Sequence, residues 1–201
     1  PVFLVSYAPK KANFSKKPVD LYILFRVYEW SAKHPYGIST NTLGPVSSLA
    51  ATYEFLSHAH GVHVPIQKLT RAAFNAIKAV PRGVFELEKE ATERLPGPPP
   101  VSSELLTIDP VGATDLDDAL GATIMDGGGF KVAVAITDPS YWLDRLCLWP
   151  HLTDKVSTLY LPNAKKPMLP GAALSDGLCS LKAAAPRPCL MLTITLTEEG
   201  E

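Results

Sequence analysis

The chain has 201 residues, of which 46% are hydrophobic, so it can bury a core and its composition is not that of a disordered polypeptide. No apolar run approaches the length that spans a bilayer and no signal-peptide pattern opens the chain, so we expect no association with a membrane. The net charge of −1 conceals 12 Lys and Arg against 7 Asp and Glu in residues 1–100, and 7 against 13 in residues 101–201. A basic first half joined to an acidic second half suits an anionic partner.

The first half predicts four helices in succession. Leu21, Leu24, Phe25 and Tyr28 recur at helical spacing, and residues 34–37 would end this first helix. Further helices are predicted from Ser47 or Ser48 to Gly61, from about Pro65 to Ala79, and from about Phe85 to Leu95. We therefore expect a helical first domain over residues 1–95, similar to a helix-turn-helix or winged-helix module.

The third predicted helix has two faces. Its apolar arc consists of Ile66, Leu69, Ala73 and Ile77, and its opposite, basic arc consists of Lys68, Arg71 and Lys78. Such a helix can pack on its neighbours and present the basic arc to a phosphate backbone. A solvated basic face explains the same pattern, and both interpretations stay open.

A proline-rich segment, residues 96–102, predicts a stiff linker between this domain and a second domain over residues 103–201. Three glycines at 127–129 separate two strand-like runs, 119–124 and 130–136, which predicts a hairpin. A further strand is predicted over 190–196 and a short helix over 174–181. The fold class of the second domain is therefore α/β or α+β.

Histidine, tryptophan and cysteine residues give weaker signals. The spacing of His58, His60 and His63 scatters them around a helix end, which favours surface histidines over a metal site. Trp142 and Trp149 are expected to pack against the sheet. The three cysteines show no metal-ligand spacing and are typical of buried thiols in a reducing compartment, so we expect a cytoplasmic protein.

The chemistry is concentrated between residues 109 and 118, where four aspartates occupy ten residues: Asp109, Asp115, Asp117 and Asp118. Carboxylates held together repel one another unless a cation neutralises them, and oxygen ligands at this density suit Mg²⁺, with Mn²⁺ as a substitute. The glycine and late glutamate of an EF-hand loop are not in place. A solvated acidic turn fits poorly with the apolar residues Leu116, Ala119 and Leu120.

This spacing of aspartates resembles the signature of the ribonuclease II and ribonuclease R (RNB) family of exoribonucleases. Three later segments agree with the family in order and in spacing: residues 132–139, ending in Asp138-Pro139; residues 157–162, containing Tyr160-Leu161-Pro162; and residues 167–181, from Pro167 to Leu181. The resemblance covers residues 106–200.

The resemblance implies an exoribonuclease that hydrolyses single-stranded RNA from its 3′ end to 5′-mononucleotides with Mg²⁺. Asp109 and Asp118 would bind the metal, Asp115 would shape the site, and Asp117 would be essential to catalysis, by supporting a second metal or orienting the attacking water. Tyr160 would stack on a base near the RNA 3′ end.

The sequence departs from the family pattern in two ways. The aromatic strand signatures of the cold-shock domains that usually precede the catalytic domain are missing, and the family's catalytic domain continues past the equivalent of Glu201. We therefore expect the chain to be a fragment, a processed product or one segment of a longer polypeptide, and to act as a monomer with the rest of its own polypeptide. The alternative function is a homologue that binds RNA without cutting it.

Overall fold

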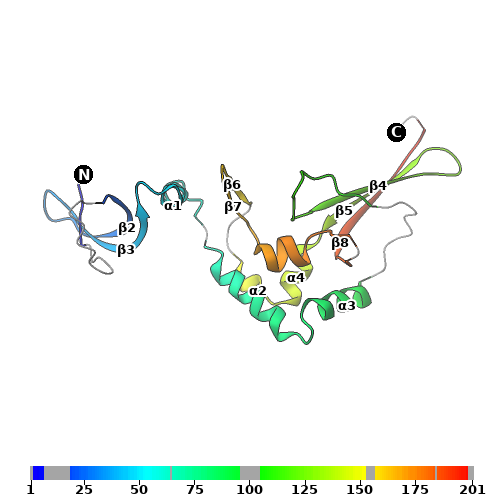
Figure 1. Cartoon of the computed structure of the whole chain (residues 1–201), viewed down its shortest axis with the longest axis horizontal. Coiled ribbons are helices and arrows are strands. Elements are labelled where there is room, and N and C mark those ends of the chain that lie inside the picture. The colour runs from blue at the N-terminus through cyan, green and yellow to red at the C-terminus, as the bar shows by residue number, and fades with distance from the viewer. Residues whose placement is uncertain are drawn as a thin grey trace. The chain divides into compact units, whose positions relative to one another are not determined.

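Figure 1 shows the computed structural model of the chain, which describes residues 2–6, 19–63, 65–95, 105–152, 157–183 and 185–198. The chain divides into two compact units, residues 1–63 and residues 64–201. The division falls at residue 63 and not at the predicted linker of residues 96–102, which itself lies outside the described residues.

The first unit contains a three-stranded sheet and one helix. The strands are β1 (Leu4–Ser6), β2 (Leu21–Glu29) and β3 (Tyr36–Pro45), in the order β1-β3-β2. β1 runs parallel to β3, and β2 runs antiparallel to it. Helix α1 (Leu49–Ala59) follows, and the hydroxyl of Ser48 caps it by accepting a hydrogen bond from the Ala51 N–H.

The helix predicted from residue 21 is wrong, because residues 21–29 form strand β2. Apolar spacing alone is ambiguous over nine residues, and this segment is rich in Ile, Val, Phe and Tyr, which favour a pleated surface. Pairing with β3, with Phe25 opposite Ser39, supplies the backbone hydrogen bonds that a helix would otherwise provide. The first 63 residues are therefore a mixed sheet and helix, and the prediction of a purely helical first domain is also wrong.

The other three predicted helices are confirmed as α1, α2 (Gln67–Ala79) and α3 (Val84–Arg94). α2 and α3 belong to the second unit. Leu69 and Ala73 of α2 and Leu87 and Ala91 of α3 are buried in one cluster with Trp142 and other residues of the second half of the chain. These two helices are thus part of the core of the second unit.

The second unit is built on an antiparallel sheet of β4 (Asp118–Ile124), β5 (Phe130–Thr137) and β8 (Cys189–Leu196), in the order β4-β5-β8. The predicted hairpin and the predicted last strand are confirmed. Gly128 and Gly129 both adopt a φ of 82° in the hairpin turn, and a side chain on Gly129 would collide with the Leu196 carbonyl. The turn therefore requires glycine there.

Short elements cover the rest of this unit. They are α4 (Pro139–Arg145), the 3₁₀ helix η1 (Trp149–His151), a hairpin of β6 (Leu159–Leu161) with β7 (Ala164–Lys166), and the π-helix η2 (Gly171–Leu178). The short helix predicted over 174–181 is present but begins three residues earlier. Asp138 caps α4 by accepting hydrogen bonds from the N–H groups of Ser140 at 3.0 Å and Tyr141 at 3.3 Å.

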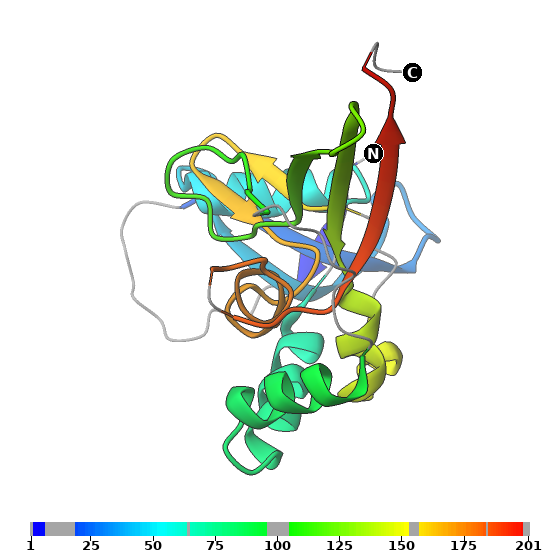
Figure 2. The same ribbon diagram turned by 90° about the vertical axis from the view of Figure 1, so that its right-hand side faces the viewer.

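The core of the second unit gathers helices α2, α3 and α4 with η2 (Figure 2). Trp142 is fully buried there among helices and not against the sheet as predicted, and Trp149 is 47% exposed. A bidentate ion pair of Arg145 with Glu90, at 2.6 and 2.9 Å, links α4 to α3. This pair therefore fixes α3 and α4 relative to each other.

The two faces of the second sheet differ in burial. Ala119, Ala133 and Ala135 point to the buried face, whereas Leu190 and Leu192 are 68% and 58% exposed on the opposite face. No helix in the described part of the chain is long and apolar enough to cross a membrane. The three cysteines are free thiols, and only Cys179 is fully buried, which raises the pKa of its thiol to about 12.

Candidate active site

Residues 109–118, which we call the acidic loop, lie between two chain segments that are hydrogen-bonded to each other. Leu106 and Leu120 exchange two backbone hydrogen bonds of 2.8 Å each, so the chain enters and leaves the loop side by side. Within it, the Ala113 N–H donates to the Pro110 carbonyl at 3.0 Å, and Gly112 has a φ of 88°. The aspartates therefore sit in a defined turn that leads directly into β4.

Ser180 holds the middle of the acidic loop. Its side chain is fully buried, and its hydroxyl donates to the Thr114 carbonyl at 2.8 Å and accepts from the Leu116 N–H at 3.1 Å. The next residue, Leu181, donates its N–H to the Leu116 carbonyl at 2.9 Å. Because Thr114 and Leu116 flank Asp115, these bonds fix the backbone on both sides of this aspartate.

The end of the acidic loop is aligned against β5. The Thr137 N–H donates to the Asp117 carbonyl at 2.9 Å, and Asp118 pairs with Ile136 in the ladder. The Thr137 hydroxyl in turn donates to the Cys179 carbonyl. Asp117 and Asp118 thus take their positions from the sheet, and Asp115 takes its position from the segment after η2.

The pKa of Asp117 lies above its ordinary value. Partial loss of hydration to the surrounding protein is the first cause, even though the residue remains exposed, and the negative charges of Asp115, Asp118 and Asp109 follow. Lys165 acts in the opposite direction. The structure therefore brings the four predicted aspartates into one electrostatic cluster.

The four carboxylates are spaced widely. In the described part of the chain, no three of these aspartates have ligand oxygens that all lie within 4.8 Å of one another. Mg²⁺ keeps several waters and is usually held by only one or two carboxylates, so this spacing is compatible with it. The donor set contains oxygen atoms alone, and their mutual repulsion favours a compensating cation. The acidic loop therefore fits Mg²⁺ or Mn²⁺.

Lys165 is a site residue that sequence reasoning missed. Its Nζ lies 2.9 Å from Oδ2 of Asp115, and this contact lowers the pKa of Asp115 and raises the pKa of Lys165. Fifty residues separate the two in sequence, and β7 brings them together. A lysine in a short β-hairpin carries no sequence signal for such a contact.

Tyr160 lies next to this ion pair. It pairs with Lys165 across the β6–β7 hairpin, and its side chain is 73% exposed. An exposed aromatic ring beside a lysine that contacts the acidic loop is suited to contact with a base or a sugar. The structure therefore places this predicted residue near the aspartates.

The predicted basic residues Lys68, Arg71 and Lys78 are exposed on α2, opposite the buried Leu69 and Ala73. This arrangement confirms the two faces of the helix. It leaves all three cations open to solvent or to an anionic ligand.

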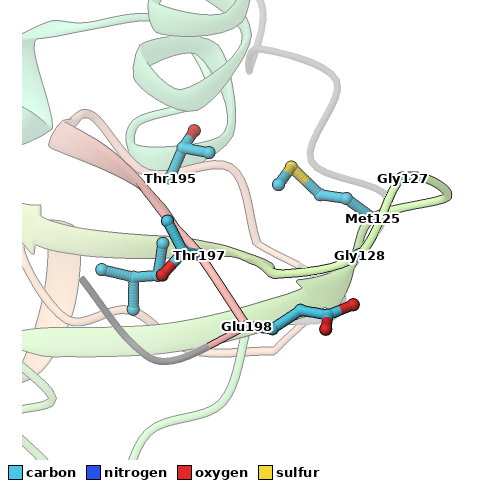
Figure 3. A pocket seen from close by; sticks show the side chains of 7 residues that line it. Met125, Gly127, Gly128, Thr195, Thr197 and Glu198 are labelled. Atoms are coloured by element: carbon cyan, nitrogen blue, oxygen red, sulfur yellow. The ribbon is translucent and has the colours of Figure 1, made fainter.

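Two hollows of the second unit lie near the acidic loop or at the far end of its strand, and neither is lined by an aspartate of the acidic loop. One, of about 980 Å³, borders the loop's apolar side through Leu116 and Ala119 and continues along Leu95, Leu181 and Met191. The other, of about 330 Å³, lies at the opposite end of β4 (Figure 3) and is lined by Met125, Gly127, Gly128, Thr195, Leu196, Thr197 and Glu198. Asp109, Asp117 and Asp118 are exposed, so a polymer can reach them from solvent.

Comparison with known proteins gives consistent matches to one family. The family described as the RNB domain matches residues 101–201. Exoribonuclease 2 of Psychromonas ingrahamii is 44% identical over 96 residues, covering 47% of this chain and 14% of that protein. Exoribonuclease 2 of Escherichia coli is 36% identical over 133 residues, covering 66% of this chain and 20% of that protein. Ribonuclease R of Vibrio cholerae is 38% identical over 98 residues, covering 48% and 12%.

Among solved structures, Mycoplasma genitalium RNase R in complex with double-stranded RNA superposes with a TM-score of 0.69 at 19% identity. The match covers 98% of this chain and 33% of that one. The likeness extends to the fold of the first 63 residues, which lie outside the family match. The chain spans no more than a fifth of the length of these three curated relatives.

Proposed function

Because this chain belongs to the RNB domain family, we propose that it forms part of an exoribonuclease that degrades single-stranded RNA from its 3′ end to 5′-mononucleotides. The observation that carries the proposal is the acidic loop, in which three neighbouring carboxylates help to raise the pKa of Asp117. Curated relatives matched over this region are exoribonucleases, and they supply the reaction class.

Within this site, Asp109 and Asp118 would hold Mg²⁺, for which Mn²⁺ can substitute, and Asp115 would shape the site. The bound ion would supply positive charge for the phosphodiester and lower the pKa of a water molecule. Asp117 would orient the attacking water or support a second ion. Without an ion, partial loss of hydration and the neighbouring carboxylates raise the pKa of Asp117, and a bound cation would offset the repulsion between these carboxylates.

Tyr160 and Lys165 would place the RNA end against the acidic loop. The exposed Tyr160 ring offers a stacking surface that tolerates any base. Lys165 positions Asp115 through their 2.9 Å contact, and its charge also attracts the RNA backbone. Tyr160 and Lys165 lie opposite each other on one hairpin, so the residue that would stack on the RNA base and the residue that orients the Asp115 carboxylate are held together.

The basic face of α2 would add affinity for RNA at a second place. Lys68, Arg71 and Lys78 are exposed, so phosphates can reach them without any change in the buried face. RNA is the proposed partner, together with the remainder of the polypeptide where one exists. We propose a cytoplasmic, monomeric protein.

The test is product analysis with the complete protein as its gene encodes it. Single-stranded RNA is incubated with Mg²⁺ and either the parent protein or its Asp117→Asn variant; a 5′ label follows the shortening of the RNA, and a uniform label identifies the released nucleotides. The parent should shorten the RNA stepwise and release 5′-mononucleotides, and the variant should bind RNA without shortening it.

Asp126→Asn is the matched control, because Asp126 is an aspartate in the β4–β5 turn, away from the acidic loop. It should cleave at the parent's rate. Cleavage by the Asp117→Asn variant within a few-fold of the parent would refute the assignment. RNA binding without cleavage by the parent would favour the alternative, an inactive RNA-binding homologue.

A further inference from the structure

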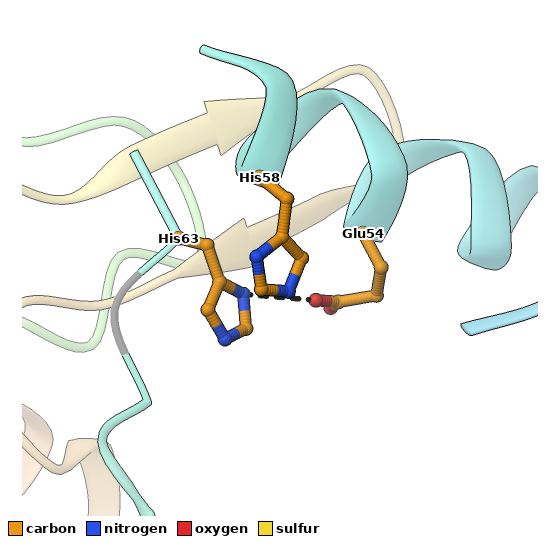
Figure 4. A group of neighbouring side chains, drawn as sticks. All are labelled: Glu54, His58 and His63. Atoms are coloured by element: carbon orange, nitrogen blue, oxygen red, sulfur yellow. Dashed lines mark ion pairs between the residues drawn. The ribbon is translucent and has the colours of Figure 1, made fainter. Parts of the chain in front are cut away.

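Glu54, His58 and His63 form a cluster at the end of α1 that is separate from the acidic loop (Figure 4). The spacing of His58, His60 and His63 in sequence predicts scattered surface histidines, but the structure brings His58 and His63 together. The rings of His58 and His63 stack with centroids 3.7 Å apart, and Nδ1 of His63 lies 3.2 Å from a Glu54 carboxylate oxygen. One potential ligand atom from each residue lies within 4.8 Å of the others.

The local fold explains the cluster. Glu54 and His58 are four residues apart on α1, so they share one face of the helix. The helix ends at His60, and the chain then reverses through Gly61, whose φ of 67° favours glycine. The Val62 N–H donates to the Ser57 carbonyl at 2.9 Å, which returns the chain alongside the helix and places His63 beside His58.

We propose that Glu54, His58 and His63 bind a divalent transition-metal ion of the Zn²⁺ type. Two imidazoles and one carboxylate are a donor set that Zn²⁺ uses with three protein ligands and one water. With metal–ligand distances of about 2.0–2.1 Å, ligand atoms in a tetrahedral site lie roughly 3.3 Å apart. The 3.2 Å separation of the His63 and Glu54 atoms already matches this value.

Because the three ligand atoms already lie within 4.8 Å of one another, binding would involve rotation of the side chains. The two stacked rings must fan apart so that one nitrogen of each points at the ion, while the backbone, fixed by the helix and by its reversal at Gly61, stays in place. All three residues are half-buried, which leaves water access to a fourth ligand position. The competing arrangement is an ion pair between protonated His63 and Glu54, and this arrangement holds no metal.

This site and the acidic loop differ in chemistry. Imidazole nitrogen favours Zn²⁺ over Mg²⁺, whereas the aspartates of the loop offer oxygen alone. Zn²⁺ at the cluster would tie residue 63, the last residue of the first unit, to α1 and stabilise that end of the unit. The proposal does not depend on the nuclease activity, because the cluster lies wholly in residues 1–63.

The test is calorimetric titration of the complete protein with Zn²⁺ in a Cys147→Ser background, because the exposed Cys147 thiol is another zinc ligand. His58→Gln, His63→Gln and Glu54→Gln should each weaken Zn²⁺ binding by about tenfold or more. Mg²⁺ in excess should not compete. His60→Gln is the matched control, because His60 is an exposed residue beside the cluster and not part of it, and it should bind Zn²⁺ like the parent.

A thermal melt supplies a second readout. Zn²⁺ should raise the Tm of the parent and of His60→Gln but not that of His58→Gln or His63→Gln, since a ligand stabilises only the state that binds it. Circular dichroism confirms that each variant is folded. Absence of Zn²⁺ binding by the parent, unchanged binding in His58→Gln or His63→Gln, or an equal loss in His60→Gln would overturn the proposal.

Discussion

Replacing Ser180 with alanine should loosen the acidic loop without touching any aspartate. The Ser180 hydroxyl is fully buried and forms two hydrogen bonds to the loop, at 2.8 Å to the Thr114 carbonyl and at 3.1 Å to the Leu116 N–H. Ser180→Ala removes both bonds and introduces no new volume. The substitution therefore tests whether the backbone tether positions the site.

The magnitude follows from the two bonds. Each contributes about 1 kcal/mol net, so the variant should lose about 2 kcal/mol of local stability. At roughly 1.4 kcal/mol for each factor of ten, the open form of the loop becomes about 30-fold more populated. A displacement of about 1 Å in a catalytic group can cost about 10²-fold in rate, so RNA hydrolysis should fall by at least tenfold.

Hydrogen exchange and kinetics measure the two effects separately. The Leu116 amide, which donates to Ser180, should exchange about 30-fold faster in Ser180→Ala than in the parent. Single-turnover cleavage of RNA at saturating Mg²⁺ should slow in parallel, while RNA binding through Tyr160 and α2 is retained.

Ser57→Ala is the control, because Ser57 is a buried serine in α1 of the first unit. It should leave both the exchange of Leu116 and the cleavage rate unchanged. If Ser180→Ala exchanges and cleaves like the parent, the tether does not set the geometry of the loop and the reasoning is refuted.

Three further predictions concern charge and stacking. Asp117→Asn should abolish hydrolysis and raise the Tm of the metal-free protein at neutral pH. The folded parent holds the Asp117 proton more tightly than the unfolded chain does, so the metal-free parent should lose stability as the pH rises between the ordinary and the raised pKa of Asp117. A Tm of metal-free Asp117→Asn below that of the parent would contradict this. Replacing Lys68, Arg71 and Lys78 together with alanine should reduce the slope of log binding constant against log salt concentration by about 0.7 for each RNA phosphate that is no longer neutralised. An unchanged slope would mean that these residues contact solvent and not RNA. Tyr160→Ala should weaken binding of the RNA end by about 1–3 kcal/mol in a fluorescence titration, whereas Tyr160→Phe should bind normally; equal losses would mean that stacking is not its role.

Local patterns in the sequence predicted much of the second unit. The glycines at 127–129 marked the hairpin, and an apolar arc with a clear polar opposite marked α2. The aspartates were visible because they lie within ten residues of one another. In each case, the information that determines the structure is contained in a short stretch of chain.

Contacts between distant segments could not be predicted in this way. Strand β2 has helical spacing, and its conformation is decided by its composition together with its pairing with β3. Ser180 lies 64 residues from Leu116, and Lys165 lies 50 residues from Asp115, so neither spacing forms a motif. The cluster at Glu54 depends on a chain reversal at Gly61 that brings His63 back to the helix.

The central claim, that a divalent ion at the acidic loop acts on the RNA phosphate, is tested most directly by metal rescue of a sulfur-substituted substrate. One non-bridging oxygen of the scissile phosphate is replaced by sulfur, and cleavage is measured in Mg²⁺ and in Mn²⁺. Mn²⁺ accepts sulfur more readily than Mg²⁺ does, so the substitution should slow cleavage strongly in Mg²⁺ and much less in Mn²⁺. An equal slowing in both ions would contradict direct contact between the ion and the phosphate.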